Sequence, residues 1–456
     1  MVKLLGIPGF ILILILAQVV VRPDYSRGAD DEVDDFGKGT ENAIATPRGA
    51  GRNQQGLYEL NTPRLTLITD IPMDDELKSW PGLFEQSIQQ LQAYFGVDSK
   101  VFDGLHVTAT LIGDRERFKK LGVLDNVPAF DEGYQLGDNL YIREQPTVYF
   151  RRLLFLHEAT HWIVWRLYGG GGSPWFMEGM AEMQGTHSLT DGRLKLGVLP
   201  SSRELVSGWG RLRMIDETLN QGAAPSMSEI LAYGNQREDH VIRYAWSWAA
   251  CVFFTNHPKY GPVLRELYDK KLDYSNSLSF KFKKRLAAEW ADVLVDWNAF
   301  VSDLDFGYDL QRSRFVSGDN TKRRKLNGGV IVNFPLETDR GWQATGIMLE
   351  IGKPVRITCS GKYILKKPTS QSDSNWVVEP QGVTYEFFRG NPLGCVIASV
   401  VPRDEVDQTE RWKTIRIGRE TEIVPDAVGE LFLKVNEPSK GLWDNAGSIS
   451  TEISSK

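Results

Sequence analysis

The sequence predicts an α+β fold in which a region of mixed strands and helices is followed by an all-β sandwich. Three observations carry this prediction. Up to about residue 305, helical apolar spacing alternates with strand-like stretches. From residue 329 onward short alternating strands dominate, and a basic stretch with Gly, Ser and Asn separates the two regions. The chain has 456 residues, of which 41% are hydrophobic, and this is enough for two separate cores.

The chain begins with a targeting segment. Residues 1–22 carry Lys3 and then run from Leu4 to Val21 almost without a polar side chain, which is typical of a signal peptide. An apolar run of about 18 residues also approaches the length that spans a bilayer, so an uncleaved signal anchor is the alternative. In both cases we expect export, and membrane contact only through an uncleaved anchor. The net charge of −6 gives no basic excess, so we expect no nucleic-acid partner.

Residues 23–57 contain an acidic cluster and few apolar side chains, which predicts a disordered linker. We expect folding to begin near Tyr58. The patterns predict strands over 64–70 and 107–112, and helices over 74–95 and 115–121. The stretch 133–142 predicts one more strand. It lies either at an open sheet edge, where an extended peptide could pair with it, or inside the sheet.

A predicted helix over 148–168 contains His157, Glu158 and His161 in the pattern H-E-x-x-H. Residues four apart on a helix project from one face, roughly 6 Å apart, so the two imidazoles can hold one metal ion. A carboxylate beside that face, here Glu158, can take a proton from a metal-activated water. The pattern therefore predicts the site of a zinc hydrolase.

The helix that follows supplies further candidates. Glycines 169–172 end the first helix, and Ser173-Pro174 is a start signal for the next. A catalytic zinc takes three protein ligands, and Glu178, in the first turns of this neighbouring helix, is the candidate for the third. Glu182 lies one turn further on the same face, where it can orient a ligand imidazole. Solvated carboxylates on a helix surface are the alternative for both.

The stretches HEATH and PWFMEGMAE together resemble the gluzincin metallopeptidases of the peptidase-MA-like group, over about residues 58–305. The resemblance implies a mixed sheet plus a helical active-site subdomain, with Glu178 as the third zinc ligand. It also implies a tyrosine, early in a later helix, that donates to the oxyanion. Tyr244 matches this place, with His240 as the competing donor and a core tyrosine as the structural alternative. No G-x-M-E-N stretch, which reads a free amino terminus in the aminopeptidases, precedes the metal helix. An endopeptidase with a peptide or protein substrate is therefore favoured.

Residues 306–328 predict a connector, and residues 329–456 predict a β-sandwich. Strands are expected over 355–359, 394–401, 414–418 and 430–435. Several stretches, among them EPQG and AVGELFLKVNEPSKGLWDNAG, resemble the small calcium-dependent galactose-binding bacterial lectins.

In those lectins an Asn-Asp pair and a later Asn-Asn pair supply calcium ligands, and the matching positions here are Glu437, Asp444 and Asn445. Oxygen ligands of this kind suit Ca²⁺. Glutamate stands in place of the shorter aspartate, and no histidine counterpart of the lectins' sugar-binding residue follows EPQG. Calcium and glycan binding therefore stay open beside a sandwich that is only a rigid appendage.

The three cysteines, Cys251, Cys359 and Cys395, are too few for a disulfide framework and too widely spaced for a zinc cluster. We expect buried thiols, with a Cys359–Cys395 disulfide as the alternative.

The sequence as a whole favours an exported zinc endopeptidase with a C-terminal lectin-like domain. A non-catalytic binding or scaffold protein, or a calcium-dependent glycan-binding protein with a relic zinc site, is the alternative.

Overall fold

A six-stranded sheet opens the chain that the structure describes. The computed structural model describes residues 48–234, 240–268, 272–316, 323–326, 329–368, 374–404 and 407–455. The strand order is β1-β2-β3-β4-β6-β5, and β3, β4 and β6 run parallel while the others pair antiparallel. The strands are β1 (Arg48–Arg52), β2 (Tyr58–Asn61), β3 (Leu65–Thr69), β4 (Val107–Ile112), β5 (Gly133–Leu136) and β6 (Asn139–Arg143). Strand β5 therefore lies at an edge of the sheet.

Alternation along the strands gives this sheet two apolar faces. Leu65 and Leu67 of β3 belong to the largest core, into which α1 (Asp75–Phe95) and α3 (Val148–Tyr168) also pack. Ile68 packs against a smaller cluster that contains Phe118 of α2 (Arg115–Lys120). The short helix η1 (Ser99–Phe102) precedes β4. The sheet is thus covered on both sides.

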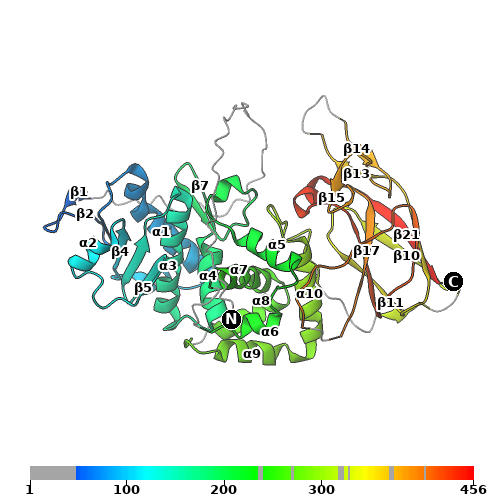
Figure 1. Cartoon of the computed structure of the whole chain (residues 1–456), viewed down its shortest axis with the longest axis horizontal. Coiled ribbons are helices and arrows are strands. Elements are labelled where there is room, and N and C mark those ends of the chain that lie inside the picture. Colours follow the sequence, from blue (N-terminus) through cyan, green and yellow to red (C-terminus); the bar gives the residue numbers. More distant parts are fainter. Residues whose placement is uncertain are drawn as a thin grey trace, which may run out of the picture. The chain divides into compact units, whose positions relative to one another are not determined.

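A group of helices follows, with α7 in its middle (Figure 1). Helix α7 packs against α4, α5, α6 and α8. The elements of this region are α4 (Pro174–Gly185), β7 (His187–Thr190), β8 (Arg193–Leu196), η2 (Glu204–Val206), α5 (Arg211–Asn220), α6 (Met227–Leu231), α7 (His240–Asn256), α8 (Tyr260–Tyr268), α9 (Ser277–Arg285), η3 (Ala287–Glu289) and α10 (Trp290–Asp303).

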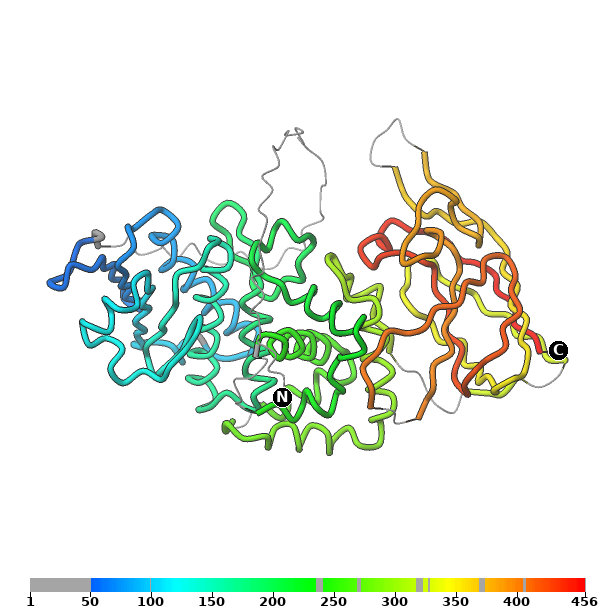
Figure 2. The backbone as a smooth tube through the Cα atoms, in the orientation of Figure 1, coloured from blue at the N-terminus to red at the C-terminus, as the bar shows by residue number. Residues whose placement is uncertain are grey.

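The C-terminal region is a sandwich of two sheets, ordered β10-β21-β12-β19 and β18-β17-β20-β11-β9. Figure 2 follows the chain from the yellow β10 to the red β21, which pair antiparallel although they lie far apart in sequence. The inner faces share one apolar core. The elements are β9 (Arg324–Lys325), β10 (Ile331–Glu337), β11 (Gln343–Leu349), β12 (Val355–Ser360), β13 (Tyr363–Lys366), β14 (Trp376–Val378), β15 (Phe387–Phe388), β16 (Asn391–Pro392), β17 (Val396–Val401), β18 (Ile415–Arg416), β19 (Glu420–Ile423), β20 (Gly429–Val435), η5 (Ser439–Asp444) and β21 (Ser448–Ser455).

The outer face of the sheet β18-β17-β20-β11-β9 packs against helix α10 through apolar and charged side chains. An apolar cluster joins Val295 and Ala299 of α10 to side chains of β17 and β20. The indole of Trp297 donates a hydrogen bond to Thr409 Oγ1 over 2.9 Å. The ammonium of Lys434 is buried and lies 2.6 Å from Asp303 Oδ2. These contacts lie within one compact unit, Ala45–Lys456.

The predicted α+β class is confirmed, and the helices predicted over 74–95 and 148–168 match α1 and α3 closely. The stretch 133–142 differs, because it folds as the β5–β6 hairpin rather than as one strand. Gly137, at the first position of the two-residue turn, has φ +57°, and glycine adopts this conformation without strain.

Structure also begins earlier than the expected Tyr58, because β1 pairs with β2 across a turn. The Asn53 side chain accepts hydrogen bonds from the backbone N–H of Gln55 and Leu57 in this turn. The segment 1–22 and most of the segment 23–57 lie outside the described residues. Among the described residues, no helix is both long and apolar enough to cross a bilayer. All three cysteines are buried and free, so the predicted buried thiols are confirmed and the disulfide alternative is wrong.

Candidate metal centre

Helix α3 presents two imidazoles on one face. Thr147 caps its start by accepting a hydrogen bond from the Phe150 N–H, and Gly169 ends it in the left-handed conformation at φ +76°. The rings of His157 and His161 have centroids 4.7 Å apart, and their Nε2 atoms lie 3.0 Å apart. Two ring nitrogens therefore converge on one point, as the four-residue spacing predicts.

The chain must turn tightly to bring the next helix back to this point. A Cβ at Gly170 would lie 2.5 Å from the Leu272 carbonyl oxygen, so no larger residue fits there. Ser173 stands at the predicted N-cap position, but its hydroxyl does not cap α4. The hydroxyl instead donates to the Ser275 carbonyl oxygen and accepts from the Ser279 N–H, which ties the turn to the 275–279 segment.

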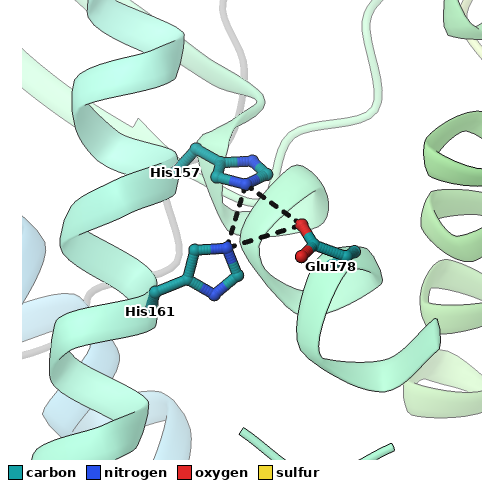
Figure 3. A group of neighbouring side chains, drawn as sticks. All are labelled: His157, His161 and Glu178. Atoms are coloured by element: carbon teal, nitrogen blue, oxygen red, sulfur yellow. Dashed lines mark hydrogen bonds and ion pairs between the residues drawn. The ribbon is translucent and has the colours of Figure 1, made fainter. Parts of the chain in front are cut away.

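Helix α4 brings Glu178 to the two histidines (Figure 3). Glu178 Oε2 lies 3.4 Å from His157 Nε2 and 3.5 Å from His161 Nε2. The ligand atoms of the three residues all lie within 4.8 Å of one another. Burial raises the pKa of Glu178, but the charges of His161 and His157 outweigh it and hold the pKa far below its usual value.

These distances fit a metal ion. Ligand atoms about 2.0–2.1 Å from a tetrahedral zinc are separated from one another by roughly 3.3 Å. Among the described residues, the buried Glu178 Oε2 has no hydrogen-bond partner. An acceptor of this kind needs a cation or a donor. Two imidazoles and one carboxylate are also the donor set of many catalytic zinc sites.

Glu158 lies buried next to the face of α3 that carries His157 and His161, and burial raises the pKa of its carboxyl to about 8. The edge strand β5 runs directly against it. A Cβ at Gly133 would lie 2.3 Å from Glu158 Oε1, so any larger residue there would displace the carboxylate. Asp138, in the hairpin turn, accepts hydrogen bonds from the Trp162 indole and the Arg166 guanidinium of α3, which fixes this strand on the helix.

Glu182 lies close to His157 and is fully buried. Its Oε1 is 3.5 Å from His157 Nδ1, and it also accepts hydrogen bonds from Arg211 on α5. Burial raises the pKa of Glu182, but the charge and hydrogen bonds of Arg211 outweigh it, so the pKa lies below its usual value. Sequence reasoning missed Arg211, because no motif surrounds it and it meets Glu182 only through tertiary packing.

Tyr244 of α7 lies near the same centre. The centroid of its ring is 6.2 Å from that of His157 and 5.8 Å from the guanidinium carbon of Arg211. The negative charge of Glu178, together with burial, raises the pKa of the phenol well above its usual value. Nothing is described for the side chain of the competing donor, His240.

The other described histidines have structural surroundings. His106 bonds with the Thr66 hydroxyl and the Pro63 carbonyl. His187 donates from Nδ1 to the Gly185 carbonyl over 2.8 Å, and burial lowers its pKa to about 4. His257 is buried, with Nε2 3.3 Å from Asp296 Oδ2. None of these three joins the group of His157, His161 and Glu178.

The structure also brings together the candidate calcium ligands of the sandwich. Asn445 Nδ2 donates to Glu437 Oε2 over 2.6 Å and to the Thr338 carbonyl over 2.8 Å. Glu437, Asp444 and Asn445 are all buried. Burial and, to a lesser extent, the charge of Asp444 raise the pKa of Glu437 to about 7, while the Asn445 hydrogen bond opposes the shift. Among the described residues, Asn445 Oδ1 has no hydrogen-bond partner.

Comparison with solved structures finds distant similarities. The chain is similar to the N-terminal domain of EclA, a PllA-like lectin, with 18% identity over 28% of this chain and 98% of that chain, at a TM-score of 0.22. It is also similar to IMPa from Pseudomonas aeruginosa in complex with an O-glycopeptide, with 10% identity over 88% of this chain, at a TM-score of 0.17. A second structure, of the IMPa metallopeptidase from the same organism, has 12% identity over 88% of this chain and the same TM-score of 0.17.

The chain spans 47% of the length of IMPa in both structures. No family model and no curated protein matches the chain. These TM-scores are too low to show a shared function.

Proposed function

We propose that this chain is an exported zinc-dependent endopeptidase. One observation supports the proposal above the others. His157, His161 and Glu178 converge from two helices on one point, with the carboxylate of Glu158 buried beside it. A structural zinc site has no use for that fourth side chain, because structural sites are closed by four ligands and need no base. The predicted signal segment at residues 1–22 supports export.

The donor set suits Zn²⁺, which when bound supplies Lewis-acid polarisation of the scissile carbonyl and lowers the pKa of water to about 7. The protein's own groups would do the rest. Glu158 would accept the proton of the attacking water and pass it to the leaving amine. A cation next to Glu158 favours its ionised form and so opposes the rise in pKa caused by burial.

Two further groups support hydrolysis of an extended peptide. The ring of Tyr244 lies 6.2 Å from that of His157, and we propose that its phenol donates to an oxyanion formed at the centre. Among the described residues, β5 is the last strand of its sheet and runs next to Glu158, where a peptide backbone could pair as an added strand. This arrangement favours an endopeptidase, because an added strand can extend past the metal in both directions.

We also propose that residues 58–305 form the peptidase domain, with β1 adding a strand to its sheet, and that 306–328, which include the sandwich strand β9, connect it to the sandwich. We propose further that the sandwich binds glycans through calcium. The observation that favours a calcium site is the buried Asn445 Oδ1, which lacks a hydrogen-bond partner among the described residues and lies next to the carboxylate of Glu437. Such oxygens are suitable Ca²⁺ ligands. Calcium titration of the full chain, followed by glycan-array binding with and without chelator, tests this second function. A Glu437→Gln variant with unchanged calcium affinity would exclude the site.

The peptidase proposal is tested with wild type, Glu158→Gln and the control Glu116→Gln, whose side chain is exposed on α2. We expect all three proteins to bind about one zinc ion. We expect wild type and the control to cleave members of a broad peptide library, and Glu158→Gln to lose activity by about 100-fold or more, as befits loss of a general base. If zinc binds but none of the proteins cleaves any peptide, the chain is a binding or scaffold protein instead.

A further inference from the structure

We infer that Arg211 is a positioning residue of the metal centre, which holds Glu182 against His157 and borders Tyr244. This inference rests on the proposed zinc site, but not on the cleavage of any substrate. Arg211 is the first residue of α5, and its side chain and that of Glu182 are buried, with 6% and 1% of their surfaces exposed. The pair lies under the metal-binding face rather than at the surface.

The contact between the two side chains is a two-point clamp. Arg211 Nε donates to Glu182 Oε2 over 2.9 Å, and Nη2 donates to Oε1 over 2.8 Å. Two parallel charge-assisted hydrogen bonds fix both the distance and the plane of a carboxylate. A single donor would leave the carboxylate free to rotate. Glu182 therefore has one fixed orientation.

That orientation directs one oxygen at a metal ligand. Glu182 Oε1, which accepts from Arg211, also lies 3.5 Å from His157 Nδ1. Among the described residues, the buried His157 Nδ1 has no hydrogen-bond partner. When His157 binds a metal through Nε2, its proton is on Nδ1 and needs an acceptor. A shift of about 0.5 Å would bring Glu182 Oε1 to ordinary hydrogen-bond distance.

Arg211 also lies over the ring of Tyr244. Its guanidinium carbon lies 5.8 Å from the ring centroid of Tyr244, and that ring is 6.2 Å from the ring of His157. One planar cation thus contacts the carboxylate behind the metal ligand and the face of the candidate oxyanion donor. Lysine could supply the charge but not the planar two-point geometry.

The test measures zinc affinity by competition with a chelator, and the visible spectrum of the cobalt-substituted protein. Because Arg211→Met alone leaves a buried, unpaired carboxylate and can fail to fold, the main variant is the double change Arg211→Met with Glu182→Gln. Arg213→Met is the matched control, since Arg213 lies on the same helix, is exposed, and pairs only loosely with Glu217 at 3.5 Å. Unfolding of the metal-free proteins shows whether each one folds.

We expect the double variant to fold, to bind zinc about 10- to 100-fold more weakly, and to show an altered cobalt spectrum. Arg211→Lys should bind zinc more weakly than wild type but more tightly than the double variant. The Arg213→Met control should match wild type. A folded double variant with wild-type zinc affinity and an unchanged cobalt spectrum would overturn the inference, as would a wild-type chain that binds no zinc. A chain that binds zinc without cleaving peptides defeats the proposed peptidase alone, because neither measurement depends on a substrate.

Discussion

Replacing Gly179 with alanine should both loosen the helix packing and weaken the metal site. Gly179 follows Glu178 in α4, at the point where this helix crosses α7. A Cβ at this position would lie 2.3 Å from the Ser247 carbonyl oxygen and 2.7 Å from Cys251 Sγ. The Ser247 oxygen belongs to the backbone of α7 and cannot rotate away. The two helices must therefore separate before an alanine fits.

The size of the effect follows from these distances. Ordinary contact begins at 3.4 Å, so moving from 2.3 Å to 3.4 Å requires about 1 Å of separation. Overpacking of this kind costs about 1–3 kcal/mol, and the gain in helix propensity from Gly to Ala returns about 1 kcal/mol at most. Metal sites tolerate errors of only about 0.2 Å in ligand distance, so a displaced Glu178 should lower zinc affinity about 10-fold or more.

Urea unfolding of the metal-free protein and chelator competition for zinc measure the two effects. The matched control is Gly82→Ala in α1, where an added Cβ meets no atom within 4 Å. We expect the control to be as stable as wild type or slightly more so, with the same zinc affinity. If Gly179→Ala keeps wild-type stability and wild-type zinc affinity, the close contact between α4 and α7 does not hold Glu178 in place, and the reasoning fails.

Three further predictions concern the contact between α10 and the sandwich, the candidate calcium site and the candidate zinc site. Lys434→Met removes the closer of the two cations next to the buried Asp303 and leaves Arg389 at 3.6 Å, so it should cost about 1–3 kcal/mol in urea unfolding. Lys413→Met breaks an exposed pair and should cost less than about 1 kcal/mol, and equal losses in the two variants would contradict this. The folded-state pKa of Glu437 is raised from 4.5 to about 7, so the folded state binds the extra proton and stability should fall by up to about 3 kcal/mol as pH rises through that window. In calcium-free buffer, this loss of stability should disappear in Glu437→Gln. If the free energy of unfolding of that variant depends on pH as it does in wild type, Glu437 is not the group responsible. Zinc at about 100 times its Kd should stabilise wild type by about 2.7 kcal/mol but not His161→Ala, as thermal unfolding with and without chelator will show.

Much of the fold and of the candidate site could be predicted from local patterns. The helix with His157 and His161 follows from apolar spacing and a terminal glycine, and the start of α4 follows from Ser173-Pro174, because these signals act within a few residues. The same reasoning misjudged details that depend on distant partners. Ser173 stands at the predicted cap position, but its hydroxyl bonds to the 275–279 segment instead.

The prediction of one strand over 133–142 overlooked a local signal. The alternation of the stretch fits one strand or two, but Gly137-Asp138 in its middle is a two-residue turn signal that favours a hairpin. Gly133 gave no signal at all in the sequence. Its role appears only where its backbone meets Glu158, since the need for glycine there comes from a side chain of another element.

The sequence by itself determined the chemistry that one helical turn can offer. The spacing of His157 and His161 is fixed by helix geometry, so two ligands and an adjacent carboxylate are readable before folding. Only the tertiary structure decided what completes and supports that turn. Glu178 reaches the two imidazoles through a glycine turn and the α4–α7 contact, and Arg211 meets Glu182 across a distance in sequence that no local pattern encodes. Ligand identity is a property of residue type and local spacing, whereas ligand distance is set by packing between elements, and packing depends on every residue at the interface.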